Sequence, residues 1–103
     1  LKSDPNHISA YYNRACACHR RGDRMNAIVY FTKAIERDPN YAEAYVNRGL
    51  IRHQLGDRNL AFADLKKGAE CFRDRGKTNA AKKIFSLIEK LQKNNSTQIS
   101  AIG

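Results

Sequence analysis

The chain has 103 residues, of which 19 are Lys or Arg and 10 are Asp or Glu, so its formal net charge is +9 at pH 7. This length allows one domain at most. No apolar run approaches the roughly 20 residues that a membrane-spanning helix needs, and no secretory signal pattern is visible. The composition excludes membrane-spanning, collagen-like and wholly disordered proteins, and the positive charge permits an acidic partner without identifying one.

The cysteines Cys16, Cys18 and Cys71 do not form a disulfide framework, because their number is odd. Without a secretory signal they indicate a reducing, cytoplasmic setting. A zinc site needs four ligands, and two residues that are two apart on a helix point to different faces. We expect buried, apolar cysteines, no metal and no cofactor.

A repeat of 34 residues organises the sequence. Asp4-Pro5-Asn6 recurs as Asp38-Pro39-Asn40, and Gly22-Asp23-Arg24 recurs as Gly56-Asp57-Arg58. Further identities at the same offset, without a gap, join residues 8–41 to residues 42–75. A period of this length indicates a solenoid of stacked units.

Each unit is predicted to contain two helices. Residues 8–21 hold neither Gly nor Pro and repeat apolar side chains at helical spacing. Gly22 is expected to end this helix, because Gly adopts the left-handed conformation of a helix C-terminus readily. Asp23 can cap the next helix, which should end before Asp38-Pro39. The second unit follows the same scheme.

The chain resembles the tetratricopeptide repeat family, whose 34-residue units fold as helix-turn-helix, and the run Asn47-Arg48-Gly49 is similar to bacterial members. The departures are Cys18 and Arg52 where the family has Tyr, Arg14 and Arg48 where it has Leu, and Arg73 where it has Pro. Because Arg73 replaces Pro, the second unit's last helix is predicted to run to about Arg75. The matching family positions are Tyr11, Ala15, Ala27, Phe31, Ala34 and Pro39, and then Tyr45, Gly49, Ala61, Leu65 and Gly68.

The predicted fold is therefore an all-α helical-repeat solenoid of antiparallel helix pairs. Residues 1–7 are expected to be the end of a preceding repeat, so that the chain would be a C-terminal part of a longer protein. Residues 8–41 and 42–75 are the two units. Residues 76–93 form a capping helix, which a solenoid needs to cover its last apolar face. Residues 94–103 are expected to be a flexible tail.

The resemblance also implies a binding surface, because the first helix of each unit lines the concave groove in this family. Asn side chains in such a groove can donate to and accept from a peptide backbone. The implied groove residues are Ser9, Tyr12, Asn13, Cys16, His19, Arg20, Glu43, Val46, Asn47, Leu50, His53 and Gln54.

No catalytic motif is visible, so we expect no enzyme. His19 and His53 occupy equivalent repeat positions, about 10 Å apart by the spacing of packed helices, which is too far for a shared metal. A carboxylate clamp of the kind some relatives have is incomplete, because Ser9 stands in place of Lys and Ala81 in place of Arg.

The expected function is protein-protein interaction, as a scaffold or adaptor that binds a partner peptide or helix in the groove. Two alternatives stay open. One is nucleic-acid binding through the basic surface, which the dispersed charge makes the weaker interpretation. The other is a purely structural solenoid segment. Exposed repeat faces are also candidates for self-association.

Overall fold

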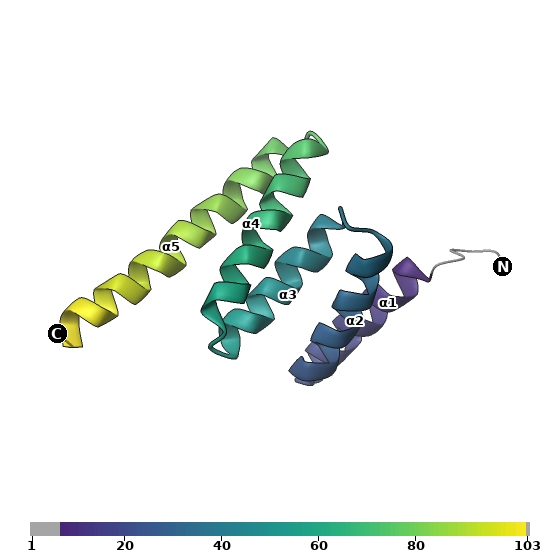
Figure 1. Ribbon diagram of the computed structural model, residues 1–103, viewed down its shortest axis with the longest axis horizontal. Helices are drawn as coiled ribbons and strands as arrows, with labels where there is room; N and C mark the ends of the chain where they lie inside the picture. Colours follow the sequence, from purple (N-terminus) through teal and green to yellow (C-terminus); the bar gives the residue numbers. More distant parts are fainter. Residues whose placement is uncertain (1–6, 103) are drawn as a thin grey trace.

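The computed structural model describes the backbone of residues 7–102 and the side chains of residues 7–93. The described part consists of five helices and contains no strand. Neighbouring helices run antiparallel in a row, with α1 and α2 at one end and α5 at the other (Figure 1). The helices are α1 (Ile8–Arg20), α2 (Arg24–Arg37), α3 (Ala42–Gln54), α4 (Arg58–Asp74) and α5 (Thr78–Ile102).

Glycines with a positive φ end three of the helices. Gly22, Gly56 and Gly76 have φ values of 81°, 86° and 78°, a conformation that costs other residues energy. At each turn the amide that follows the glycine donates back to a carbonyl of the preceding helix, as from Asp23 to Cys18 at 2.9 Å. The turn between α4 and α5 therefore has the same construction as the turns inside the two repeat units.

The connection between α2 and α3 is built differently. The backbone amide of Asn40 donates to the Asp38 carboxylate at 3.1 Å, and the Tyr45 hydroxyl donates to the Pro39 carbonyl oxygen at 2.9 Å. Pro39 cannot continue a helix. This segment therefore ends α2 at Arg37 and leads into α3 at Ala42.

The core follows the boundaries between the helices. Phe31, Ile51 and Leu65 are the largest fully buried side chains, and they lie on α2, α3 and α4. Glycines allow α3 and α4 to approach closely. A Cβ atom on Gly68 would lie 2.6 Å from Cγ2 of Val46, and one on Gly49 would lie 3.0 Å from the Ala61 carbonyl oxygen. Small residues are therefore required at this contact.

A buried ionic cluster, which the sequence pattern did not predict, joins α3 to α4 within the second unit, and a hydrogen bond connects it to the first unit. Asp64 on α4 is only 5% exposed. Arg48 donates to both Asp64 carboxylate oxygens, at 2.8 and 2.7 Å, and Arg52 donates to one of them at 2.9 Å. Arg48 also donates to the Thr32 hydroxyl of α2 at 3.0 Å. The two arginines of α3 that depart from the family pattern thus share one carboxylate as their ion-pair partner.

The ends of α4 and α5 can be compared with the predicted boundaries. The longer second helix of unit two ends at Asp74, close to the predicted Arg75. The last helix does not end at Lys93, because α5 continues to Ile102. The backbone of residues 94–102 is therefore helical, and no Gly or Pro interrupts the helix there. The flexibility expected for residues 94–103 stays a prediction. The preceding repeat predicted over residues 1–7 lies outside the described residues, apart from His7.

Candidate functional site

The candidate site is a cavity of about 360 Å³, hereafter the groove cavity. Four of the five helices contribute to it. Its walls come from α1 and α3 on one side and from the end of α4 and the start of α5 on the other. The lining residues are Tyr12, Glu43, Val46, Asn47, Phe72, Ala80, Lys83 and Ile84.

Tyr12 and Asn47 form one polar wall. The Nδ2 of Asn47 donates to the Tyr12 hydroxyl at 2.9 Å. The ring of Tyr12 stacks on that of Tyr41, with centroids 4.9 Å apart, and contacts Phe31 edge-on at 5.5 Å. Burial, with a smaller contribution from Cys16, raises the pKa of Tyr12 from 10.0 to about 12. Tyr12 is therefore held in place as a neutral phenol.

Glu43, which lines another side of the groove cavity, forms an ion pair with Arg75. Glu43 on α3 accepts two hydrogen bonds from Arg75, each at 3.1 Å. These bonds to Arg75 hold the pKa of the Glu43 carboxyl below its ordinary value. The Arg75 guanidinium also lies 5.3 Å from the ring centroid of Phe72. Glu43 is thus occupied by an internal partner, and it keeps the end of α4 next to α3.

The remaining wall is apolar, with one cation. Val46 contacts α4 where Gly68 leaves room. Phe72, Ala80 and Ile84 add apolar surface from α4 and α5, and Lys83 brings an ammonium group to the same cavity. An apolar wall with a few polar groups is the usual composition of a binding cavity.

The structure brings only part of the predicted groove set together. Tyr12, Glu43, Val46 and Asn47 line the groove cavity. Asn13, the repeat equivalent of Asn47, instead lines a separate cavity between α1 and α2. The other predicted residues lie outside the lining of the groove cavity: Ser9, Cys16, His19, Arg20, Leu50, His53 and Gln54.

Some of those outer residues have contacts of their own. Cys16 is half-buried and packs against the core of unit one. Gln54 accepts a hydrogen bond from Arg24 of α2 at 3.1 Å. The rings of His53 and Phe62 lie 6.1 Å apart. Each of these three residues thus has a neighbour within the chain.

Sequence reasoning missed the α4 and α5 side of the groove cavity. Lys83 and Ile84 lie on the predicted capping helix, outside the predicted groove set, yet both line the groove cavity. The sequence offered one signal for this side of the cavity. A capping helix packs against the last unit of a solenoid, so it can extend the surface that the helices of the units form. Phe72 gave a weaker signal, as an aromatic residue near the end of α4.

Two kinds of site are missing from the part of the chain that the structure describes. No three His, Cys, Asp or Glu side chains there are placed to hold a metal ion. None of the helices in that part combines the length and apolar character needed to cross a membrane.

The helix order and the groove cavity define the class of protein: an all-α helical-repeat solenoid. Two models of the tetratricopeptide repeat match the chain, over residues 8–41 and over residues 30–62. Together they span more than half of the chain, and it belongs to the tetratricopeptide repeat family. Membership makes it a protein-interaction repeat module.

Solved structures agree with this fold. Two structures of MamA are similar, with TM-scores of 0.61 and 0.59 and 20% sequence identity in each case. The matches cover 91% and 87% of this chain, but only 63% and 57% of the MamA chains. This chain therefore spans about three-fifths of each MamA structure. No curated protein matches it in sequence.

Proposed function

We propose that the groove cavity binds a peptide or helix of a partner protein, and that the chain acts as a non-catalytic scaffold or adaptor in the cytoplasm. The observation that supports this most strongly is the convergence of four helices on one cavity with an apolar wall and fixed polar groups. A cavity of about 360 Å³ accommodates one or two side chains of a partner.

The charges around the groove cavity favour a particular kind of partner segment. Glu43 is already neutralised by Arg75, whereas Lys83 has no ion pair with any residue that the structure describes. Val46, Phe72 and Ile84 favour an apolar side chain. The expected ligand segment is an apolar anchor residue next to an acidic residue.

The test introduces a bulky side chain into the groove cavity. Peptides selected on the wild-type chain from a displayed library would be measured against Ala80→Phe, which fills the cavity from α5. Asn79→Phe is the matched control, because Asn79 is the exposed neighbour and does not line the cavity. We expect Ala80→Phe to weaken binding by about tenfold or more and Asn79→Phe to leave it unchanged.

Two other outcomes would contradict peptide binding in the groove cavity. Equal binding by both variants would move the peptide site out of the groove cavity. Failure to select any peptide, together with nucleic-acid binding that weakens steeply with salt, would favour the basic surface instead. Circular dichroism of both variants verifies that α5 remains folded.

A further inference from the structure

The turns inside the two units lie at the same edge of the molecule, which we call the turn edge. It consists of residues 20–26, around the α1–α2 turn, and residues 54–60, around the α3–α4 turn. In Figure 1 both turns lie at the lower side, opposite the α2–α3 connection and the α4–α5 turn. The Nε of Arg24 donates to the Oε1 of Gln54 at 3.1 Å, which joins the start of α2 to the end of α3. The two turns are therefore neighbours on one surface.

Large apolar side chains are concentrated on the turn edge. Met25 is 66% exposed, Leu55 is 46% exposed and Leu60 is 47% exposed. Five large apolar side chains of the described residues are exposed to a comparable degree, and these are three of them. Exposed apolar groups that gather on one surface mark a contact with another protein or with a membrane.

The repeat shows that packing does not require apolar residues at these positions. At the offset of 34 residues each of them has a polar equivalent in the other unit: Asn59 for Met25, Arg21 for Leu55 and Asn26 for Leu60. Both units nevertheless form the same helix-turn-helix, with a glycine of positive φ at the turn. The repeat fold therefore does not explain why the turn edge is apolar.

Guanidinium groups without an ion pair accompany the apolar side chains. Arg20, Arg24 and Arg58 are exposed, and none of them forms an ion pair with a residue that the structure describes. The whole chain carries a net charge of +9. The partner that fits the turn edge by charge is therefore anionic.

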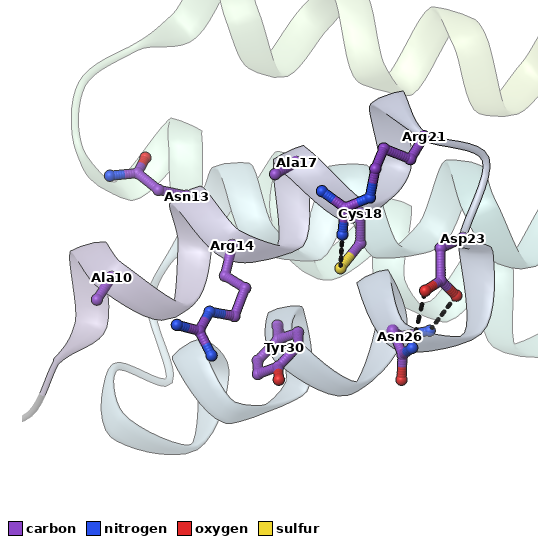
Figure 2. Close-up of a pocket in the computed structure, with 9 residues that line it drawn as sticks. All are labelled: Ala10, Asn13, Arg14, Ala17, Cys18, Arg21, Asp23, Asn26 and Tyr30. Atoms are coloured by element: carbon purple, nitrogen blue, oxygen red, sulfur yellow. Dashed lines mark hydrogen bonds between the residues drawn. The ribbon is translucent and has the colours of Figure 1, made fainter.

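The acidic residues of the turn edge do not cancel this charge. Four arginines and two aspartates, Asp23 and Asp57, lie in residues 20–26 and 54–60. The aspartates stand directly before α2 and α4, where the helix dipole offsets part of their charge. Asp23 also accepts two hydrogen bonds from Asn26, at 3.3 and 2.8 Å (Figure 2). The charge that remains available to a partner is positive.

The turn edge is distinct from the end faces of the solenoid and from the cavities. A unit packed before α1 or after α5 would lengthen this edge without covering it, because repeats contact only their neighbours in the stack. Met25, Leu55 and Leu60 line neither the groove cavity nor the cavity between α1 and α2. These side chains are thus displayed on an outer surface.

We propose that the turn edge binds peripherally to an anionic phospholipid bilayer. Met25, Leu55 and Leu60 enter the boundary between headgroups and acyl chains, and the flanking arginines donate hydrogen bonds to lipid phosphates. This contact goes beyond peptide binding in the groove cavity. The groove cavity is lined by other residues, so a scaffold held at a membrane in this way keeps it free for a partner.

Two other anionic partners fit the turn edge less well. Nucleic-acid bases stack on aromatic side chains, and residues 20–26 and 54–60 contain none. The anchor residues of protein interfaces fill pockets, whereas the three apolar side chains line neither of the two cavities described. A bilayer needs no matching shape and takes up separate apolar side chains along an edge.

The first test removes the apolar side chains. Co-sedimentation measures binding of the full chain to vesicles of phosphatidylcholine alone, and to vesicles of phosphatidylcholine with an equal amount of phosphatidylserine. The variant carries Met25→Asn and Leu60→Asn, which introduce the residue that the other unit has at the same positions. The control is Phe85→Asn, which removes an exposed apolar side chain from α5. Circular dichroism verifies that each variant is folded.

The second test removes charge in the same assay. The variant carries Arg24→Gln and Arg58→Gln. The matched control carries Lys66→Gln and Lys82→Gln, which remove the same charge from exposed positions outside the turn edge.

The wild-type chain is expected to bind the vesicles that contain phosphatidylserine and to bind pure phosphatidylcholine about tenfold more weakly or not at all. Each of the two turn-edge variants should weaken binding to the anionic vesicles by about tenfold, and each control by less than about twofold. Equal binding to both kinds of vesicle, no binding to either, or equal losses in variants and controls overturns the proposal.

A third measurement does not depend on the Asn variants. The chain contains no Trp, so Leu60→Trp introduces a single fluorescent reporter and keeps a large apolar side chain at the turn edge. Brominated acyl chains in the anionic vesicles are expected to quench this fluorescence, and to leave that of Phe85→Trp unchanged. Unquenched fluorescence of Leu60→Trp overturns the proposal.

Binding of another polyanion would reassign the turn edge. The probes are polyglutamate, for an acidic protein, and oligo(dT), for nucleic acid. Binding of either probe that the turn-edge variants abolish, in the absence of binding to vesicles, would identify that class of partner and overturn the proposal of a bilayer.

Discussion

At Asp64, one buried carboxylate accepts hydrogen bonds from two arginines of the facing helix. Both arginines are substantially shielded, with side chains 12% and 19% exposed. An ion pair of this kind adds little net stability compared with an apolar contact, but removal of one partner leaves uncompensated charge behind. Removal of the Asp64 carboxylate would therefore leave two shielded arginines without a counter-charge.

The substitution Asp64→Asn is expected to lower the free energy of unfolding by about 3 kcal/mol, because Arg48 and Arg52 lose their counter-charge. Urea denaturation followed by circular dichroism measures the change. Asp57→Asn is the control, since Asp57 is exposed and its side chain accepts no capping hydrogen bond, and it should alter stability by less than about 0.5 kcal/mol. Equal effects of the two substitutions would contradict the assigned role.

Tyr12 gives a prediction about pH. Its pKa is raised from 10.0 to about 12, chiefly by burial, so the folded state holds the phenolic proton more tightly than the unfolded chain. The stability that this contributes is complete below pH 10 and is lost as the pH rises through 12. The stability difference between the wild-type chain and Tyr12→Phe is therefore expected to shrink across this window.

Urea denaturation of both proteins at a series of alkaline pH values measures that difference. At neutral pH, Tyr12→Phe should cost about 1 kcal/mol, because Asn47 loses its hydrogen-bond acceptor. A stability difference that stays constant up to about pH 12 would show that Tyr12 is ionised as easily in the folded as in the unfolded chain.

At the scale of the helices, α3 and α4 form the closest pair. Gly68→Ala would place a Cβ atom 2.6 Å from Val46 and 3.1 Å from the Ala42 carbonyl oxygen. Alanine favours a helix over glycine by about 1 kcal/mol, but overpacking costs about 1–3 kcal/mol. The net expectation is a loss of stability of about 1 kcal/mol.

Thermal or urea denaturation of Gly68→Ala measures that loss. Lys67→Ala, at the exposed neighbouring position, is the control for a substitution on this helix that causes no overpacking, and it should lie within about 0.5 kcal/mol of the wild-type chain. If Gly68→Ala instead stabilised the protein, the contact between α3 and α4 would have to be looser than the structure shows.

The elements themselves were largely predictable from the sequence. The repeat offset and the glycines at the turns placed α1 to α4, and the replacement of Pro by Arg73 anticipated the longer α4. The offset assigns equivalent positions but does not identify their neighbours. Asn13 and Asn47 are equivalent, yet Asn13 lines the cavity between α1 and α2 (Figure 2) and Asn47 lines the groove cavity. The Asp64 cluster also depends on a contact between helices that periodicity cannot reveal.

For the whole molecule, the elongated shape of 57 × 32 × 18 Å means that most contacts join helices adjacent in sequence. α1 and α5 each pack against one main neighbour, whereas α2, α3 and α4 each pack against two. In such a chain, stability is a sum over units and their nearest-neighbour interfaces. The central helices should therefore open last.

Native-state hydrogen exchange tests this expectation. Amides of α3 should show the greatest protection, and those of α1 and of the described part of α5 the least. Leu65→Ala removes a fully buried side chain and should lower protection throughout α3 and α4, at a cost of about 2–5 kcal/mol. Equal protection of all five helices would indicate a single cooperative unit instead.

The close contact at Gly49 and Gly68 has a mechanical consequence. Where backbones approach this closely, two helices behave as one stiff plate, because an interior packed without gaps resists compression. The compliance of the solenoid next to this plate then resides at the joints on its two sides, between α2 and α3 and between α4 and α5. The α4–α5 joint carries one wall of the groove cavity, so a partner that widens the groove does elastic work by tilting α5 and leaves the central plate undistorted.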